Sequence, residues 1–371
     1  MSITRRHALK LTSTAVAAPL VLRATDALAS SGSVKVLAWQ DYIQPNIAEK
    51  FQADTGITLE LTTFGSNDEA ESTIRSAGGK GFDVVFPSIT NVPNYNDENG
   101  KSYFAPLPAE VNSGAIIPSF LRDSAALGGM QNGEQVVLPF DWGTEGITLN
   151  KAALPLDDRN LSYADLFGEG AKAAFRQKSV IMGVGLYLDA SGEVPSNRML
   201  DVYKSEEDAR RVWGAVAEWI IARKDKFAAF WNNGTEATAA FKDVGANIGQ
   251  TWDTTGLLLN RENADFVYRA PKEGIITWLD SFGMMREAPN PEQAIAFMNF
   301  MLQPEVGGMV ANNTGYNSAV AGAADHASDE FKAQFNDVYT ADVLGNMWWW
   351  QADTPWFAPV RNEIVELITN A

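Results

Sequence analysis

The chain contains no cysteine, and only two of its 371 residues are histidines. The absence of cysteine excludes disulfides, thiolate metal sites, cysteine nucleophiles and the lipid anchor of a lipoprotein. One histidine, His326, lies beyond the first 29 residues, among Ala, Asp and Ser, where we expect it in solvent. A multi-histidine metal site and a Ser-His-Asp triad are therefore not expected.

Signatures of cofactor binding and catalysis are missing as well. The sequence has no P-loop, Rossmann fingerprint, EF-hand loop or G-x-S-x-G elbow. We therefore expect no cofactor, no metal and no catalytic residue, and a protein that is not an enzyme. Basic residues are few, because 29 Lys and Arg stand against 46 Asp and Glu, for a formal net charge of −17. Such a chain repels nucleic acid and attracts cations, although its charge also serves solubility.

The first 29 residues carry the pattern of an export signal. Arginines at positions 5 and 6 precede a mildly apolar stretch, and a small-x-small cleavage site ends at Ala29. The arginine pair matches the twin-arginine signal, with Ala8 where a phenylalanine is more usual. We predict a twin-arginine signal peptide over 1–29 and a mature chain in the periplasm; the alternative is an amphipathic helix of the mature fold. No later apolar run approaches the ~20 residues of a membrane span.

From residue 34 onward, short apolar strands alternate with helical patterns, which is typical of an α/β fold. Pro45 and Gly56 bound one helix. Expected strands span 34–39, 57–64, 82–86, 180–182, 227–231, 246–252, 266–268 and 275–278, with a further strand-and-helix unit between 136 and 150. Expected helices begin after Ser66 (capping box with Glu69) and Ser205, and span 290–301 and 359–368. No linker or repeat is visible, which favours two lobes joined by several crossing segments.

Eleven tryptophans are present, and four of them follow or end expected strands: Trp39, Trp142, Trp252 and Trp278. Ligands of open α/β sheets bind at the carboxyl ends of strands, so these indoles are candidates for a cleft. In an extended segment Trp278 and Asp280 face the same side. An ammonium group there gains up to about 2 kcal/mol from the ring and a charge-assisted hydrogen bond from the carboxylate. The alternative is that the tryptophans pack in a core.

Several motifs, in order along the chain, carry a family resemblance. They are Trp39-Gln40-Asp41-Tyr42, Phe51 to Ile57, Ser66-Asn67-Asp68-Glu69, Phe82 to Ser88, Trp142-Gly143, Pro271-Lys272-Glu273-Gly274, Trp278-Leu279-Asp280-Ser281, Gly315-Tyr316 and Trp350-Gln351. On these motifs the chain resembles the periplasmic spermidine/putrescine-binding proteins, the substrate-binding components of polyamine-type ABC importers. The resemblance covers nearly the whole chain beyond the export signal.

The resemblance implies an α/β, two-lobed periplasmic-binding-protein fold of type II, with the ligand in a cleft between discontinuous lobes. Lobe 1 would comprise 30–144 and 279–327, and lobe 2 would comprise 145–278 and 328–371. It also implies a monomer that closes on a small amine ligand and docks on an ABC permease in the inner membrane. The ligand-binding residues so expected are Trp39, Tyr42, Ser88, Trp252, Trp278, Asp280, Tyr316 and Gln351.

The sequence departs from the family pattern on the second lobe. The two acidic residues that hold the far amine of a polyamine would align near Val184 and Tyr187, and neither is acidic. A family aromatic after Ser88 is also missing. Glu145 or Asp253 could replace the acids, so Asp253 joins the expected site.

Otherwise the ligand has one cationic end, as a GABA-like amino acid or a quaternary amine has, with its other end neutral or bound by an arginine. Arg198, Arg261 and Arg286 are candidates that no motif places. Outside this class, a secreted hydrolase that uses a carboxylate pair such as Asp253 and Asp280 is an alternative. A sugar-binding protein is another, because indoles also stack on sugars.

Overall fold

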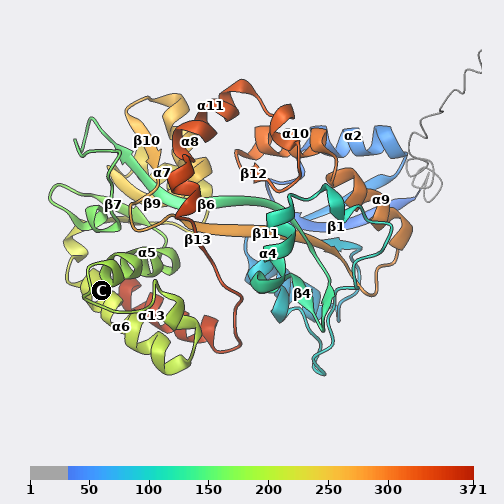
Figure 1. Ribbon diagram of the computed structural model, residues 1–371, viewed down its shortest axis with the longest axis horizontal. Coiled ribbons are helices and arrows are strands. Elements are labelled where there is room, and N and C mark those ends of the chain that lie inside the picture. The colour runs from blue at the N-terminus through green and yellow to red at the C-terminus, as the bar shows by residue number, and fades with distance from the viewer. Residues whose placement is uncertain (1–31) are drawn as a thin grey trace, which may run out of the picture.

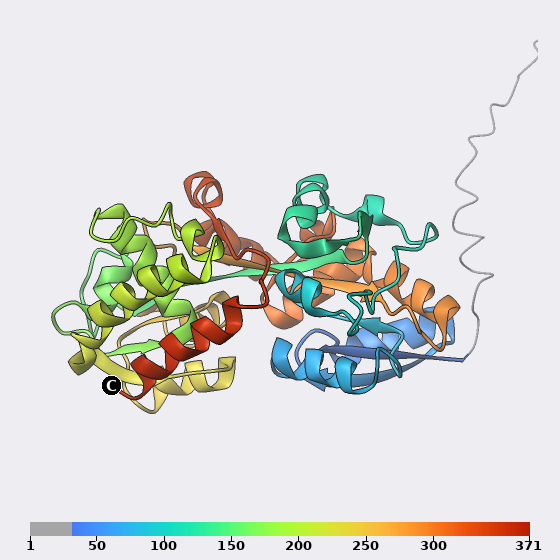
Figure 2. The same cartoon turned by 90° about the horizontal axis from the view of Figure 1, so that it is seen from below.

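The computed structural model describes residues 32–371, so the predicted export signal over 1–29 lies outside the described residues. Two lobes lie side by side (Figures 1 and 2). Two long strands, β6 (Leu138–Asn150) and β11 (Ile276–Met284), run antiparallel and pass from one lobe into the other (Figure 2). The α/β architecture with several crossing segments agrees with the sequence-based prediction.

The lobe that contains the first strand is built on a small parallel sheet. Its strands are β1 (Ser33–Trp39), β2 (Thr58–Phe64) and β3 (Val84–Val85). Its helices are α2 (Pro45–Thr55), α3 (Asn67–Ser76), α4 (Pro118–Ser124), α9 (Pro291–Met301) and α10 (Pro304–Thr314). Gly56 ends α2 at φ 73°, where a side chain would be strained. Phe51 of α2 meets Phe297 of α9 edge to face, with ring centroids 5.3 Å apart, so these helices share a buried core with the sheet.

The other lobe has a separate core around buried Trp213. Its strands are β7 (Ala173–Phe175), β8 (Phe227–Phe230) and β9 (Ile248–Trp252). Its helices are α5 (Gln177–Ala190), α6 (Glu206–Ile221), α7 (Gly234–Lys242), α8 (Asp253–Glu262) and α13 (Phe357–Thr369). A third apolar cluster joins the two lobes, because it contains Val85 of the first lobe together with Leu257 and Tyr268 of the second.

A continuous sheet in the order β2-β1-β3-β11-β6-β9-β7-β8 runs through both lobes. The β6–β11 register shifts between Leu279 and Ser281, which leaves Asp280 at an irregularity of the ladder. Short strands join β6 or β11: β10 (Phe266–Arg269), β12 (Asn317–Ser318) and β13 (Trp348–Trp349). The remaining strands form a hairpin of β4 (Met130–Gln131) and β5 (Glu134–Gln135), and the remaining α-helices are α11 (Asp329–Val338) and α12 (Ala341–Gly345).

Some expected elements differ in the structure. Residues 180–182 lie in helix α5 and are not a strand. The prediction failed because α5 is buried on almost all sides, so its apolar residues do not show the spacing of an amphipathic helix. The expected strand-and-helix unit between 136 and 150 is the single strand β6. The predicted capping box at α3 is half formed: Ser66 Oγ accepts from the Glu69 backbone N–H, but the Glu69 carboxylate accepts from the N–H of Gly65.

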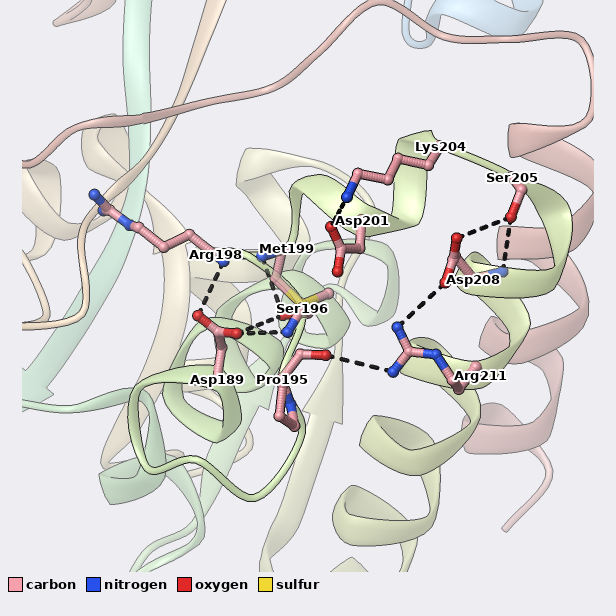
Figure 3. Close-up of polar contacts among 10 residues, drawn as sticks. All are labelled: Asp189, Pro195, Ser196, Arg198, Met199, Asp201, Lys204, Ser205, Asp208 and Arg211. Atoms are coloured by element: carbon pink, nitrogen blue, oxygen red, sulfur yellow. Dashed lines mark hydrogen bonds and ion pairs between the residues drawn. The ribbon is translucent and has the colours of Figure 1, made fainter.

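The connection between α5 and α6 contains three successive non-glycine residues with left-handed backbone, Asn197, Arg198 and Met199, at φ 50°, 53° and 64°. Such residues cost roughly 1–2 kcal/mol each. Figure 3 shows the Asp189 carboxylate beneath this turn, where it accepts hydrogen bonds from the backbone N–H of Ser196 (2.5 Å) and of Arg198 (2.9 Å). Charge-assisted bonds of this kind offset the strain.

Candidate ligand-binding site

A cleft of about 1390 Å³ is lined by residues of both lobes. Its walls include the ends of β1 and β9, the middle of β11, the first turn of α5, and residues along most of α7 and α8. Seven of the nine residues predicted to bind ligand line this cleft: Trp39, Tyr42, Ser88, Trp252, Trp278, Asp280 and Tyr316.

We call the side of the cleft that contains Asp280 the first wall, and the side that contains α5 the second wall. Asp280 lies in the middle of β11, and its Oδ2 accepts a hydrogen bond from the Tyr42 hydroxyl at 2.5 Å. Oδ1 has no hydrogen-bond partner among residues 32–371. Burial raises the pKa of Asp280 to about 6, although hydrogen bonds from Ser88 and Tyr42 act in the opposite direction. A cation brought to this carboxylate by a ligand would restore its ordinary ionisation.

Aromatic rings that contact one another line the cleft with Asp280. Trp278 and Tyr316 meet edge to face with ring centroids 4.7 Å apart, and Tyr316 meets Tyr42 in the same way at 6.3 Å. The Trp278 ring lies against Gly143 of the paired strand, where any Cβ would overlap the indole. A glycine on β6 therefore lets an indole on β11 lie close to the sheet while it faces the cleft.

A second carboxyl group, Asp141 of β6, lies behind Asp280. It is fully buried, and neither oxygen has a hydrogen-bond partner in the described part of the chain. The nearby Tyr42 hydroxyl aligns with Asp280 instead. Burial first, and then the charge of Asp280, raise the pKa of Asp141 well above its usual value, which favours the neutral form of this group. The sequence analysis did not identify Asp141, since only the β6–β11 pairing brings it to the site.

The second wall carries basic side chains that the sequence analysis also missed. Arg176 and Lys178 lie at the start of α5 and Arg361 on α13, and all three line the cleft. Burial lowers the pKa of both Arg176 and Lys178. The charge of Glu145 opposes this shift at Arg176, and repulsion among the three cations adds to it. The local signal was Arg176-Gln177-Lys178 directly after an apolar strand, but nothing local indicated that this strand ends at the cleft.

The three arginines considered from the sequence have other partners. Arg198 donates to Asn346 Oδ1 at 2.9 Å, and Arg286 lies 3.6 Å from Asp97; neither lines the cleft. Arg261 does line it, but its guanidinium pairs with Glu330 at 3.1 Å.

Trp252 lines the cleft with one face engaged by the protein itself. The Arg176 guanidinium carbon lies 5.3 Å from the Trp252 ring centroid and 5.9 Å from that of Trp231. The indoles thereby hold Arg176 in place by cation–π contacts. This arrangement differs from the expectation that Trp252 would receive the cationic part of the ligand.

Two of the nine predicted residues lie outside the lining. Asp253 is fully buried at the start of α8 and accepts from Tyr339 Oη (2.7 Å) and from the backbone N–H of Thr144 (3.2 Å), so it joins α8 to β6. Burial raises the pKa of Asp253 to about 7. Gln351 turns back, and its Nε2 donates to the Trp349 carbonyl at 2.7 Å.

Three further positions also lie away from the cleft. Trp142 packs against Tyr339, with ring centroids 5.3 Å apart. The alignment that placed Val184 and Tyr187 opposite the ligand is wrong, because Val184 is fully buried in the core of its lobe and Tyr187 packs on Trp219. The residues of α5 that line the cleft are Arg176 before it and Lys178 and Ser179 in its first turn.

A protein-family model and several known proteins match this chain. The model of the family described as bacterial extracellular solute-binding protein matches residues 46–336. The chain belongs to this family. It is 25% identical over 281 residues to the spermidine/putrescine-binding periplasmic protein of Escherichia coli K12, covering 75% of each chain. It is 28% identical over 286 residues to the putrescine-binding periplasmic protein SpuD of Pseudomonas aeruginosa, covering 73% of this chain and 74% of that one.

Solved structures of similar fold confirm the two-lobed architecture. A putative spermidine/putrescine ABC transporter protein from Listeria monocytogenes superposes with a TM-score of 0.72 at 24% identity, over 91% of this chain and 98% of that one. Within residues 32–371, no helix has both the length and the apolar character to cross a membrane. The protein is thus a solute-binding protein whose candidate site is the cleft between its lobes.

Proposed function

We propose that this protein captures a small solute bearing a cationic amine in the periplasm, and delivers it to an ABC permease of the inner membrane without chemical change. One observation carries the proposal. The buried Asp280 carboxylate opens on the cleft beside Trp278 and Tyr316, and no ion pair within residues 32–371 involves it. A desolvated carboxylate among aromatic rings favours an ammonium group by charge and by cation–π contact.

Lobe closure is part of the proposal. The cleft of about 1390 Å³ exceeds the roughly 300–1,000 Å³ of pockets that enclose small ligands, so the walls must approach to exclude water. We place the hinge in β6 and β11, at 144/145 and 278/279, where the predicted lobes meet. Contacts that a ligand makes to both walls at once exist only in the closed form, and they would drive closure. The closed monomer is the form that we expect the permease to recognise.

The names of the relatives support the choice of ligand and compartment, since the similar proteins are named for spermidine or putrescine and as periplasmic. The geometry disfavours the hydrolase alternative. Asp253 lies outside the cleft with its carboxylate engaged by Tyr339 and Thr144, so it cannot act with Asp280 as an acid–base pair on one substrate.

A linear diamine is the second candidate, because Glu145 also lines the cleft and its buried Oε2 has no hydrogen-bond partner in residues 32–371. It could take the second ammonium group.

A thermal-shift and calorimetry panel of amines, ω-amino acids, betaines, carboxylic acids and sugars tests the proposal. At a hundred times its dissociation constant a ligand stabilises the protein by about 2.7 kcal/mol. We expect stabilisation only by compounds with a cationic nitrogen. Asp280→Asn should lose at least tenfold in affinity, whereas the exposed Asp225→Asn should bind as the wild type does. Binding of a sugar or of an amine-free acid by both proteins would contradict the proposal.

A further inference from the structure

The second wall of the cleft gathers three basic side chains, Arg176, Lys178 and Arg361, and the nearby carboxylates of Glu145 and Asp353 also line the cleft. None of the ion pairs within residues 32–371 involves Arg176, Lys178 or Arg361. The Nε atoms of Arg176 and Arg361 are buried without a hydrogen-bond partner there. In addition to burial, the charge of Arg361 lowers the pKa of Arg176, and the charges of Arg176 and Arg361 lower the pKa of Lys178, so the three cations lie near one another. Like charges gathered in a partly desolvated wall are unfavourable unless an anion joins them.

The start of α5 adds uncharged donors to the same wall. This 14-residue helix has no side-chain cap and no acidic residue in its first turn, so its free N–H groups and positive dipole end are not neutralised. Ser179 in that turn is fully buried and lines the cleft, and its Oγ has no partner in the described part of the chain. Thr255, in the first turn of α8, is 2% exposed and also lines the cleft with an unpartnered hydroxyl. Hydroxyls, N–H groups and basic side chains together are the donors that an anion needs.

The position of Arg176 is set by packing. Its guanidinium lies over Trp252 and Trp231, and these two indoles meet edge to face with centroids 5.1 Å apart. A guanidinium fixed on indoles retains its planar fork for a bidentate anion, and its ordering is complete before ligand binds. Trp252 then serves the anionic end of a ligand by way of Arg176, while Trp278 and Tyr316 serve the cationic end at Asp280.

We propose that the solute is a linear zwitterion, in which an ammonium group binds Asp280 on the first wall and a carboxylate binds Arg176, Lys178 and Ser179 on the second. This inference rests on the proposed capture of an amine, and it specifies the chemical group at the other end of the ligand. A diamine would place its second ammonium group beside three cations, with the carboxylates of Glu145 and Asp353 as counter-charges on that side. A zwitterion satisfies both walls, and lobe closure then brings two opposite charges of one ligand to two opposite charges of the protein.

Calorimetry with five probes tests the inference: 4-aminobutanoate, 5-aminopentanoate, putrescine, butylamine and butanoate. We expect one of the amino acids to bind at least tenfold more tightly than putrescine, butylamine or butanoate. Arg176→Gln should weaken amino-acid binding tenfold or more, as expected for lost bonds between charged groups, and should change butylamine binding by less than threefold. Arg211→Gln, an exposed arginine of the same lobe, is the matched control.

The outcomes separate the two proposals. If putrescine binds more tightly than both amino acids, or if Arg176→Gln weakens butylamine and the amino acid equally, the zwitterion is refuted while amine capture stands. If no probe with an amine binds, the proposed function fails and the zwitterion with it. Should Arg176→Gln fail to fold, Arg176→Lys and Lys178→Met take its place. Each should weaken the amino acid selectively, and equal loss for butylamine would refute the inference.

Discussion

Replacing Asp280 with asparagine should make the empty protein more stable while it weakens ligand binding. The side chain is 3% exposed, and burial raises its pKa from the usual 3.8 to about 6. Between these values the folded state holds a proton that the unfolded chain has lost, so stability falls as pH rises through this window and is flat above it. At about 1.36 kcal/mol per pKa unit, the wild type forfeits about 3 kcal/mol by pH 7. Asparagine carries no charge and can still accept from Tyr42, so it removes this cost.

Affinity for an amine should change with pH in the opposite direction. Only the ionised carboxylate pairs with an ammonium group, so the affinity of the wild type should rise up to tenfold per unit from pH 4.5 to about 6 and then level off. For Asp280→Asn we expect a flat, weak affinity over the same range.

Urea unfolding of ligand-free wild type and Asp280→Asn from pH 4 to pH 8, with calorimetry at the same pH values, measures both effects. The two proteins should be equally stable near pH 4 and should differ by about 3 kcal/mol above pH 6.5. Asp225→Asn controls for the loss of one negative charge, because Asp225 is exposed on the other lobe. A variant that is less stable than the wild type at pH 7 would refute the view of Asp280 as a buried, uncompensated acid.

Two further substitutions test other parts of the account. Gly143→Ala should displace the Trp278 indole, lower amine affinity at least fivefold and alter the tryptophan fluorescence change on binding, because a Cβ at 143 overlaps that ring; unchanged titrations would argue against a role for the indole. Asp189→Ala should destabilise its lobe by about 3 kcal/mol or more in urea unfolding, since it removes three charge-assisted bonds that support the left-handed turn, while affinity in the folded protein stays within twofold. A stability loss below 1 kcal/mol would contradict the stated role of Asp189.

The sequence predicted the parts of the fold that local signals determine. Pro45 and Gly56 bound α2 as expected, and Asp280 faces the cleft two residues after Trp278, because β11 continues as an extended strand through both. Residues 180–182 of helix α5 were predicted as a strand because the helix is buried in the core, and its continuous apolar run resembles a buried strand. Val184, which the alignment placed opposite the ligand, lies in the same helix.

The residues that were missed owe their positions to long-range pairing. Asp141 reaches the amine site only because β6 lies beside β11, and Arg176 reaches the cleft only because β7 lies beside β9. Neither residue has a local motif that points to a ligand. Asp253 follows Trp252 directly and was therefore expected in the site, but the first turn of α8 directs it into the interior. The direction in which the first side chain of a helix points depends on how the helix packs, and the position of that residue in the sequence does not determine it.

The most direct test of the central claim is a crystal structure with the tightest-binding amine of the panel. We expect closed lobes with the ligand nitrogen about 3 Å from Asp280 Oδ1 and in contact with the face of Trp278. A ligand whose nitrogen lies away from Asp280, or a closed cleft in which Asp280 still faces no cation, would contradict the account.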